Sequence, residues 1–295
     1  MKFVWSDAYN VDLYGHVFPI EKYKLTKGAI LTSGLGQAGD FVEAAPAAID
    51  DLLLVHTRAY VDDLLNLRWS ERTMRSEMAL TRQIVDAYIV AAGGTIAASG
   101  QALMDGICIH LGGGYHHAYP DHAEGFCYIN DVAVAIANLR KERLIERACV
   151  VDCDLHQGNG TAFIFAREPD VFTFSIHQEN NYPPKERNDL DIGLPDGATD
   201  DKYLTELAAV GDILDRHKPD ICVYLAGADP FAGDMLGGLG LTKDGLKKRD
   251  ALVFRECRTR RVPVCVVLAG GYAPDVQDVV DIHVNMVCEA TRIFA

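Results

Sequence analysis

The chain has 295 residues, of which 49% are hydrophobic, so its core can be sizeable, and length alone fits one large α/β domain or two small ones. Its 28 basic and 42 acidic side chains give a formal charge of −14 at pH 7, and such a field repels nucleic acid and favours a cationic partner only weakly. The first residues, MKFVWSDAYN, lack the apolar segment of a signal peptide, and no uninterrupted apolar run is long enough to cross a membrane, so we expect a cytoplasmic protein without membrane contact.

The predicted elements alternate between helices and short apolar strands. Apolar spacing predicts helices over residues 81–104, 126–143, 201–218 and 242–261, and apolar runs predict strands over 107–111, 148–153, 171–176, 221–226 and 262–269. Strands that are apolar almost throughout are covered on both faces. No linker interrupts the chain, so we expect one domain over residues 1–295, of the α/β class, with an open, mostly parallel sheet flanked by helices on both faces.

Ligand-type side chains follow the strand predicted at 148–153. Alternation along an extended backbone would point Asp152, Asp154 and His156 to one side. Buried carboxylates this close repel one another unless a cation or a protonated imidazole stabilises them, so a metal site and a hydrogen-bonded Asp/His cap are both open readings. Asp229, which follows another strand, favours the metal, because two carboxylates and one imidazole leave positions free for water and substrate.

Two adjacent imidazoles, His116 and His117, follow a run of three glycines after the strand at 107–111. Such a pair is either structural or a general base with its helper. Asp152 and Asn159 are the polar groups expected to orient the two rings. A carboxylate partner would keep one ring charged, whereas an amide partner would leave the other more nearly neutral.

Tyr272 follows the glycine pair that ends the last apolar strand. A phenol at this place could donate a hydrogen bond to a developing oxyanion, or it could simply pack under the glycine turn.

Taken together, these segments resemble the histone deacetylase and acetylpolyamine amidohydrolase family, whose fold is arginase-like, and they are most similar to its bacterial or class IV-like branches. The resemblance rests on HLGGGYHHAYPDHAEGFCYINDVAVAI, VVDCDLHQGNGTAFIF and GADPFAGDMLGGLGLT, with weaker matches in LAGGYAP and GHVFPIEKY. The ordered segments span most of the chain.

This resemblance implies a catalytic set. The implied metal ligands are Asp154, His156 and Asp229, with zinc as the ion and iron(II) as an alternative. His117 would act as general base and then as general acid, His116 paired with Asp152 would give electrostatic help, and Tyr272 would polarise the amide carbonyl.

The resemblance also implies how substrate is held. The backbone carbonyl of Gly125 would accept from the substrate amide, and Phe126 and Tyr182 would form the two walls of a narrow tunnel. Leu236 stands where some polyamine-directed relatives carry a glutamate. An apolar residue at this position favours acyl-lysine in a protein or peptide as the substrate. An N-acylated polyamine or other small amine remains the alternative substrate.

A structural monovalent cation, K⁺ or Na⁺, is implied as well. Its site would comprise Asp152, Asp154, the carbonyl of His156, Ser175 and the carbonyl of Ile176. Two other readings are disfavoured by the sequence. A catalytically silent binding module should lack one of the catalytic side chains, and all of them are present; an arginase-type ureohydrolase would need a second metal set, and the sequence offers only one. The oligomeric state is left open by the sequence.

Overall fold

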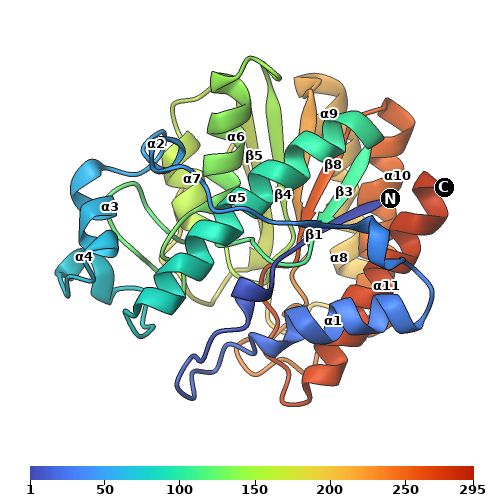
Figure 1. The fold of residues 1–295 in the computed structure, drawn as a ribbon. Helices are drawn as coiled ribbons and strands as arrows, with labels where there is room; N and C mark the ends of the chain where they lie inside the picture. The colour runs from blue at the N-terminus through green and yellow to red at the C-terminus, as the bar shows by residue number, and fades with distance from the viewer.

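The computed structural model describes residues 1–295 and contains one eight-stranded sheet (Figure 1). The strands are β1 (Lys2–Trp5), β2 (Phe41–Glu43), β3 (Ile107–His110), β4 (Ala148–Asp152), β5 (Val171–Gln178), β6 (Leu190–Leu194), β7 (Ile221–Leu225) and β8 (Val264–Val267). Their order across the sheet is β2-β1-β3-β8-β7-β4-β5-β6, and every neighbouring pair is parallel. The carboxyl ends of all eight strands therefore meet at one edge, where ligands bind in such sheets.

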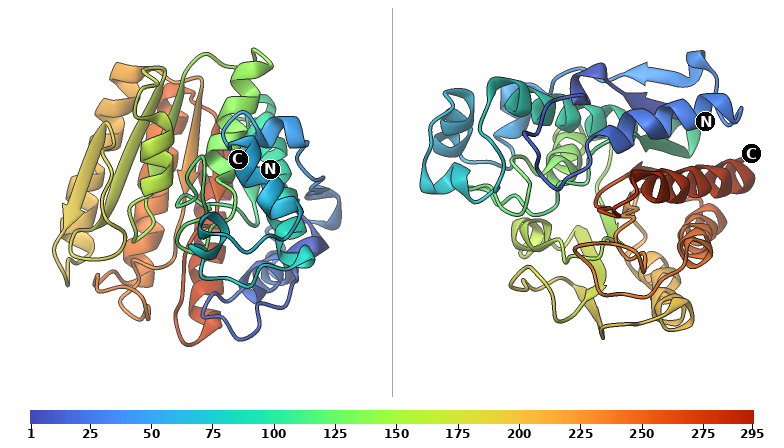
Figure 2. Two further views of the ribbon diagram at one scale, coloured as in Figure 1. Left: turned by 90° about the vertical axis from the view of Figure 1, so that its left-hand side faces the viewer. Right: turned by 90° about the horizontal axis from the view of Figure 1, so that it is seen from below.

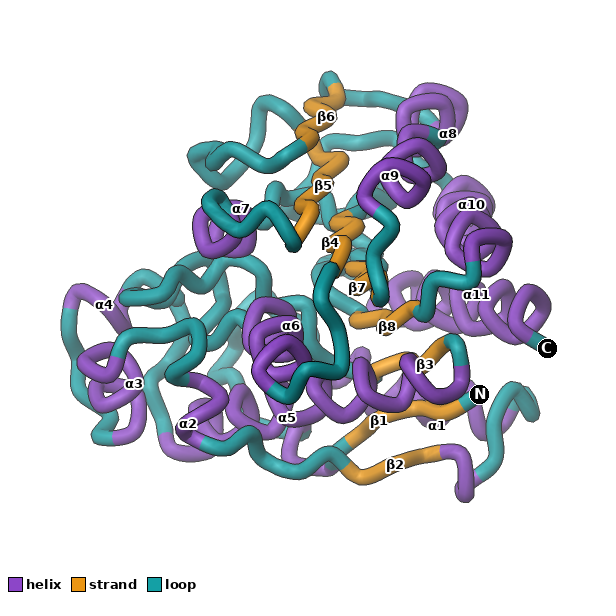
Figure 3. Tube along the Cα trace, turned by 90° about the horizontal axis from the view of Figure 1, so that it is seen from above, coloured by secondary structure: helices purple, strands orange, loops and turns teal.

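Helices cover both faces of this sheet, as the view along it in Figure 3 shows. The helices are α1 (Glu21–Thr32), α2 (Ile49–Leu52), α3 (Arg58–Leu65), α4 (Glu71–Met74), α5 (Arg82–Asp105), α6 (Asp131–Lys141), α7 (Asn159–Phe165), α8 (Asp200–Leu207), α9 (Ala209–His217), α10 (Lys243–Arg260) and α11 (Val276–Phe294). One face carries α5, α6 and α7, and the other carries α8 to α11, with α1 packed beside α11 (Figure 2). The α/β class and the parallel sheet expected from the sequence are confirmed.

The central strands form the core because they offer apolar side chains to both layers of helices. Every residue of β4, β7 and β8 is buried, which agrees with their nearly continuous apolar sequences. The helix α5 is long and apolar enough to cross a membrane by length and composition, but 67% of its most apolar window is buried inside the fold, as in a core helix.

Two helices differ from the predicted ones. The segment 201–218 forms α8 and α9 rather than one helix, because Gly211 N–H donates to Ala208 O, three residues back, and this tighter turn interrupts the α-helical pattern. The helix expected from residue 126 begins at Asp131. Phe126 has a φ of +64°, outside the helical region, and the Asn130 side chain accepts from Ala133 N–H and so caps the helix start.

Three strands were not expected from the sequence. Both β1 and β2 are only three or four residues long, and β6 lies at the sheet edge with residues that are only partly buried. Short or half-exposed strands lack the long apolar run that identified the central ones.

Candidate active site

The loop after β3 carries the two adjacent histidines and is held by Asp131, the first residue of α6. The Asp131 carboxylate accepts hydrogen bonds from Gly114 N–H (3.1 Å) and Tyr115 N–H (2.7 Å). Gly114 has a φ of +88°, and a Cβ atom there would lie 2.7 Å from the backbone of Ala269. A glycine is therefore required for the loop to pass so close to the end of β8.

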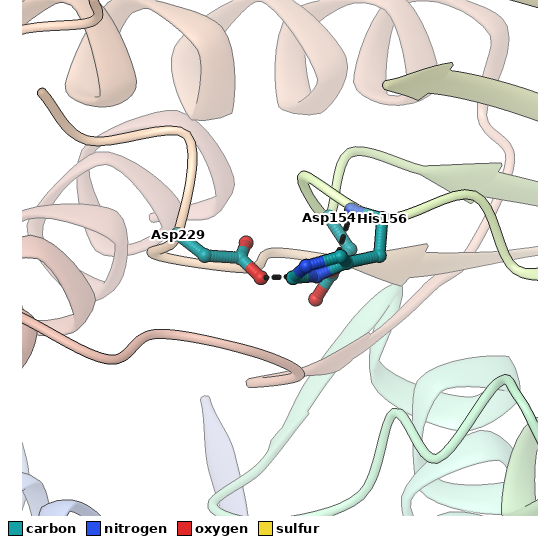
Figure 4. Close-up of side chains that lie close together, drawn as sticks. All are labelled: Asp154, His156 and Asp229. Carbon is teal, nitrogen blue, oxygen red and sulfur yellow. Dashed lines mark hydrogen bonds and ion pairs between the residues drawn. The ribbon is translucent and has the colours of Figure 1, made fainter. Parts of the chain in front are cut away.

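Asp154, His156 and Asp229 converge at the carboxyl ends of β4 and β7 (Figure 4). Their ligand-type atoms all lie within 4.8 Å of one another, and all three residues are buried. His156 Nδ1 is 3.3 Å from Asp154 Oδ1 and 3.3 Å from Asp229 Oδ2. The strand itself ends at Asp152, so Asp154 and His156 lie in the following loop.

The two carboxylates of this cluster are affected differently, because burial would raise the pKa of Asp154 but His116 and His156 hold it well below its usual value. Burial and the neighbouring Asp154 raise the pKa of Asp229 to about 7. Burial alone would lower the pKa of His156, but its two carboxylate neighbours raise it to about 10. A cation between the carboxylates would relieve the repulsion between them.

The donor atoms present fit a divalent metal ion. Asp229 is fully buried, and its Oδ2 accepts no well-aligned hydrogen bond, although His156 Nδ1 lies 3.3 Å from it. A Cβ atom on Gly270 would lie 2.1 Å from the same Oδ2 and 2.7 Å from Asp154 Oδ2, so the glycine leaves room for both carboxylates. Two carboxylates and an imidazole could hold such an ion and still leave coordination positions for other ligands.

The two histidines next to this cluster have different partners. His116 Nδ1 lies 2.7 Å from Asp152 Oδ2, and His117 Nδ1 lies 2.7 Å from Asn159 Oδ1. Burial alone would lower the pKa of His116, but Asp152 and Asp154 raise it to about 9. Burial and the neighbouring histidines hold the pKa of His117 well below its usual value. One ring is thus cationic and the other neutral near pH 7.

A cavity of about 220 Å³ leads to these groups. It is lined by Glu77, His117, Gly125, Phe126, His156, Asn181, Tyr182, Leu236 and Tyr272. The four residues expected at the substrate thus share one cavity with His117 and His156. They are Gly125, Phe126, Tyr182 and Leu236.

Tyr272 is held at this cavity by its backbone N–H, which donates to Asp234 Oδ2 (2.6 Å). Its ring centroid is 6.3 Å from that of His156 and 6.0 Å from that of Phe126. Burial and the nearby carboxylates raise the pKa of the Tyr272 phenol well above its usual value, so the hydroxyl keeps its proton.

The residues expected around a monovalent cation lie at neighbouring strand ends. Asp152 on β4 is paired in register with Ser175 on β5, and Ile176 follows on the same strand. In the structure Ser175 Oγ lies 2.9 Å from His177 Nδ1, and Asp152 Oδ1 accepts from Asp154 N–H (3.1 Å).

Several site residues were missed by the sequence analysis. Glu77 and Asn181 line the cavity, but neither belongs to a motif that would single it out. Lys22 is fully buried, donates to Ala269 O (2.6 Å) and lies 5.8 Å from the ring centre of Tyr272. It belongs to GHVFPIEKY, a segment whose pattern gives no sign that the lysine turns inward.

A cavity lined by His117 and His156, beside paired histidines and buried carboxylates at the carboxyl edge of a parallel sheet, is the layout of an enzyme site in an α/β fold. Residues 16–287 match the family model described as the histone deacetylase domain, and the chain belongs to this family. Family membership indicates a hydrolase that acts on amides.

Individual relatives agree with this placement. The chain is 40% identical to an uncharacterized protein of Picosynechococcus sp., over 91% of this chain and 90% of that one. It is 30% identical to a histone deacetylase-like amidohydrolase of Pseudomonas aeruginosa, over 88% and 73% of the two chains. Among solved structures, a histone deacetylase homologue from Aquifex aeolicus matches with a TM-score of 0.84 at 23% identity, covering 99% of this chain and 84% of that one. A crystal structure of such a homologue complexed with SAHA matches with a TM-score of 0.83 and the same coverage.

Proposed function

We propose that the protein is a zinc-dependent deacylase that removes acetyl or another short acyl group from lysine side chains of proteins or peptides. Iron(II) is an alternative ion for the same ligands. The observation that carries the proposal is the convergence of Asp154, His156 and Asp229 beside a cavity that His117 and Tyr272 also line.

Asp154, His156 and Asp229 would hold the metal. A bound divalent ion would make a water molecule more acidic and polarise the substrate carbonyl. His156, whose ring lies between two carboxylates, would then bind the ion as a neutral imidazole.

His117 would serve as the general base. Its Nδ1 faces the amide oxygen of Asn159, which can only accept, so Nδ1 carries the proton and Nε2 is free to take another one from water. The same nitrogen would then deliver that proton to the leaving amine. His116, kept cationic by Asp152, would stabilise the negative charge that develops during the attack.

Tyr272 would donate its hydroxyl proton in a hydrogen bond to the substrate oxygen as that oxygen becomes negative. Phe126 and Tyr182 would enclose the aliphatic chain that carries the amide, and Gly125 would accept from the amide N–H through its carbonyl. A K⁺ or Na⁺ ion near Asp152 and Ser175 would add positive charge behind the site. We also propose that the protein is cytoplasmic and that residues 1–295 form a single catalytic domain.

A second candidate substrate is an N-acylated polyamine. The observation that favours it is that Glu77 lines the cavity, because a carboxylate on this residue would attract an ammonium group beyond the amide. Leu236, which lines the same cavity, offers no such charge and favours the lysine substrate.

Turnover of an acetyl-lysine peptide beside N-acetylputrescine, by zinc-reconstituted protein, tests the proposal. We expect the peptide to be preferred and His117→Ala to abolish turnover. Preference for the diamine, reduced in Glu77→Gln, would favour the second candidate instead. Turnover of neither amide would contradict both substrate assignments.

A further inference from the structure

Helix α10 contains a buried ion pair that lies outside the active-site cavity. Arg249 and Asp250 are both 0% exposed, although they belong to the charged stretch KKRD. A guanidinium and a carboxylate are rarely buried so completely unless they are paired and hydrogen-bonded.

The guanidinium joins the two loops that carry the carboxylate ligands. Arg249 Nη1 donates to Gly227 O (2.6 Å) and to Cys153 O (3.3 Å). Cys153 directly precedes Asp154, and Gly227 lies two residues before Asp229. One side chain thus satisfies a backbone carbonyl at the exit of β4 and another at the exit of β7, where the sheet no longer provides partners.

The remaining donors of the guanidinium fix its orientation. Asp250 Oδ1 accepts from Arg249 Nε (3.0 Å) and Nη2 (2.8 Å), and from the hydroxyl of Tyr224 (2.5 Å) on β7. Because β7 leads into the loop of Asp229, the pair is anchored to the same strand whose exit it holds. A planar fork with fixed donors sets the separation of two backbone segments more tightly than a flexible ammonium would.

We propose that Arg249 is a positioning residue of the metal site, which presets the distance between the segments bearing Asp154 and Asp229. Asp250 and Tyr224 hold the guanidinium in place. The inference rests on the proposed metal-dependent function and adds to it a source of metal affinity remote from the ligands. Groups that hydrogen-bond metal ligands and orient them typically contribute about 10–100-fold to metal affinity, and we expect an effect of this size from Arg249.

The test compares zinc affinity with the stability of the metal-free protein. In the double variant Arg249→Met/Asp250→Leu both charges are replaced together, because an apolar pair of similar volume often leaves the stability of a fold nearly unchanged. We expect the metal-free variant to fold and to melt in one transition, at a temperature lowered by the two carbonyls left without a donor, whereas its dissociation constant for Zn²⁺, measured by competition with a chromophoric chelator, rises about 10–100-fold. Lys248→Met, which removes an exposed charge one residue away, is the matched control and should leave the constant unchanged.

Arg249→Lys gives an independent test in case the double variant does not fold. It keeps the buried cation beside Asp250 but loses the fork, so zinc binding should again weaken. A dissociation constant equal to that of the wild type in either folded variant would overturn the inference. If the wild type itself binds no zinc, the proposed function fails. If the wild type and the variants all bind zinc equally tightly, only the inference about Arg249 fails.

Discussion

His117 and Asn159 form a hydrogen bond of 2.7 Å between Nδ1 and the amide oxygen, and Asn159 Nδ2 lies 3.2 Å from the hydroxyl of Tyr119. The Tyr119 hydroxyl donates to Glu186 Oε1 (3.3 Å) and so accepts from Asn159 Nδ2, which fixes the amide oxygen toward the imidazole. The proton of His117 therefore sits on Nδ1, which leaves Nε2 free to accept a proton.

Asn159→Asp should make His117 more basic, because a carboxylate beside an imidazole favours the protonated ring. The base must be neutral to accept a proton, so the acidic limb of the profile of kcat/KM against pH should move upward by about 1 unit or more. An acidic limb that stays in place would show that His117 is not the group titrating there.

Tyr182 forms one wall of the cavity, and its hydroxyl donates to Glu124 Oε1 (2.9 Å). Since the aromatic ring provides the wall, Tyr182→Phe should keep kcat/KM within about threefold, whereas Tyr182→Ala should lower it about 10–100-fold. Steady-state kinetics with one acetyl-lysine peptide check both variants. Equal losses in the two would assign the effect to the hydroxyl and its bond to Glu124 rather than to the ring.

His56 should make the fold sensitive to acid. It is buried, its Nδ1 lies 3.0 Å from Tyr119 O, and its Nε2 accepts from Asn130 N–H (3.1 Å), so a second proton would break the latter bond. Burial lowers the pKa of His56 to about 4. The unfolded chain takes up this proton below about pH 6.5 and the folded chain only below about pH 4, so stability falls as the pH drops through that window, by roughly 3 kcal/mol in total.

Urea unfolding of the metal-free protein at several pH values between about 7 and 4 measures this loss. His56→Gln keeps a donor and an acceptor but has no titrating ring, so its stability should fall less steeply than that of the wild type. Identical slopes for the two proteins would contradict the assignment to His56.

The central strands and the cluster of candidate ligands could be predicted from the sequence because both follow simple local patterns. The runs that became β4 and β7 are apolar throughout, and neighbouring parallel strands bring the loops at their carboxyl ends to one edge. From this reasoning we expected Asp229 to lie close to Asp154 and His156, and the structure places it there. Asp152, which the alternation put on the same face, was expected to orient an imidazole rather than to bind the metal, and in the structure it pairs with His116.

The burial of individual charged residues could not be predicted from such patterns. Arg249 and Lys22 each stand in a stretch rich in exposed charged residues, and spacing alone gives no sign that a particular one turns inward. Glu77 reaches the cavity through a loop with a φ of +63° at this residue, and the alternation of apolar and polar residues does not predict such a loop. Contacts between segments distant in sequence decide these positions, and one sequence contains no record of them.

Titration of zinc into the metal-free protein, with the bound metal and the hydrolysis of an acetyl-lysine peptide followed together, tests the central claim most directly. We expect turnover to rise in proportion to bound zinc and to stop at one ion per chain, whereas Asp229→Asn should bind zinc weakly and turn over little substrate. Full turnover without metal, or one tightly bound ion and normal activity in Asp229→Asn, would contradict a metal-dependent amide hydrolase built on Asp154, His156 and Asp229.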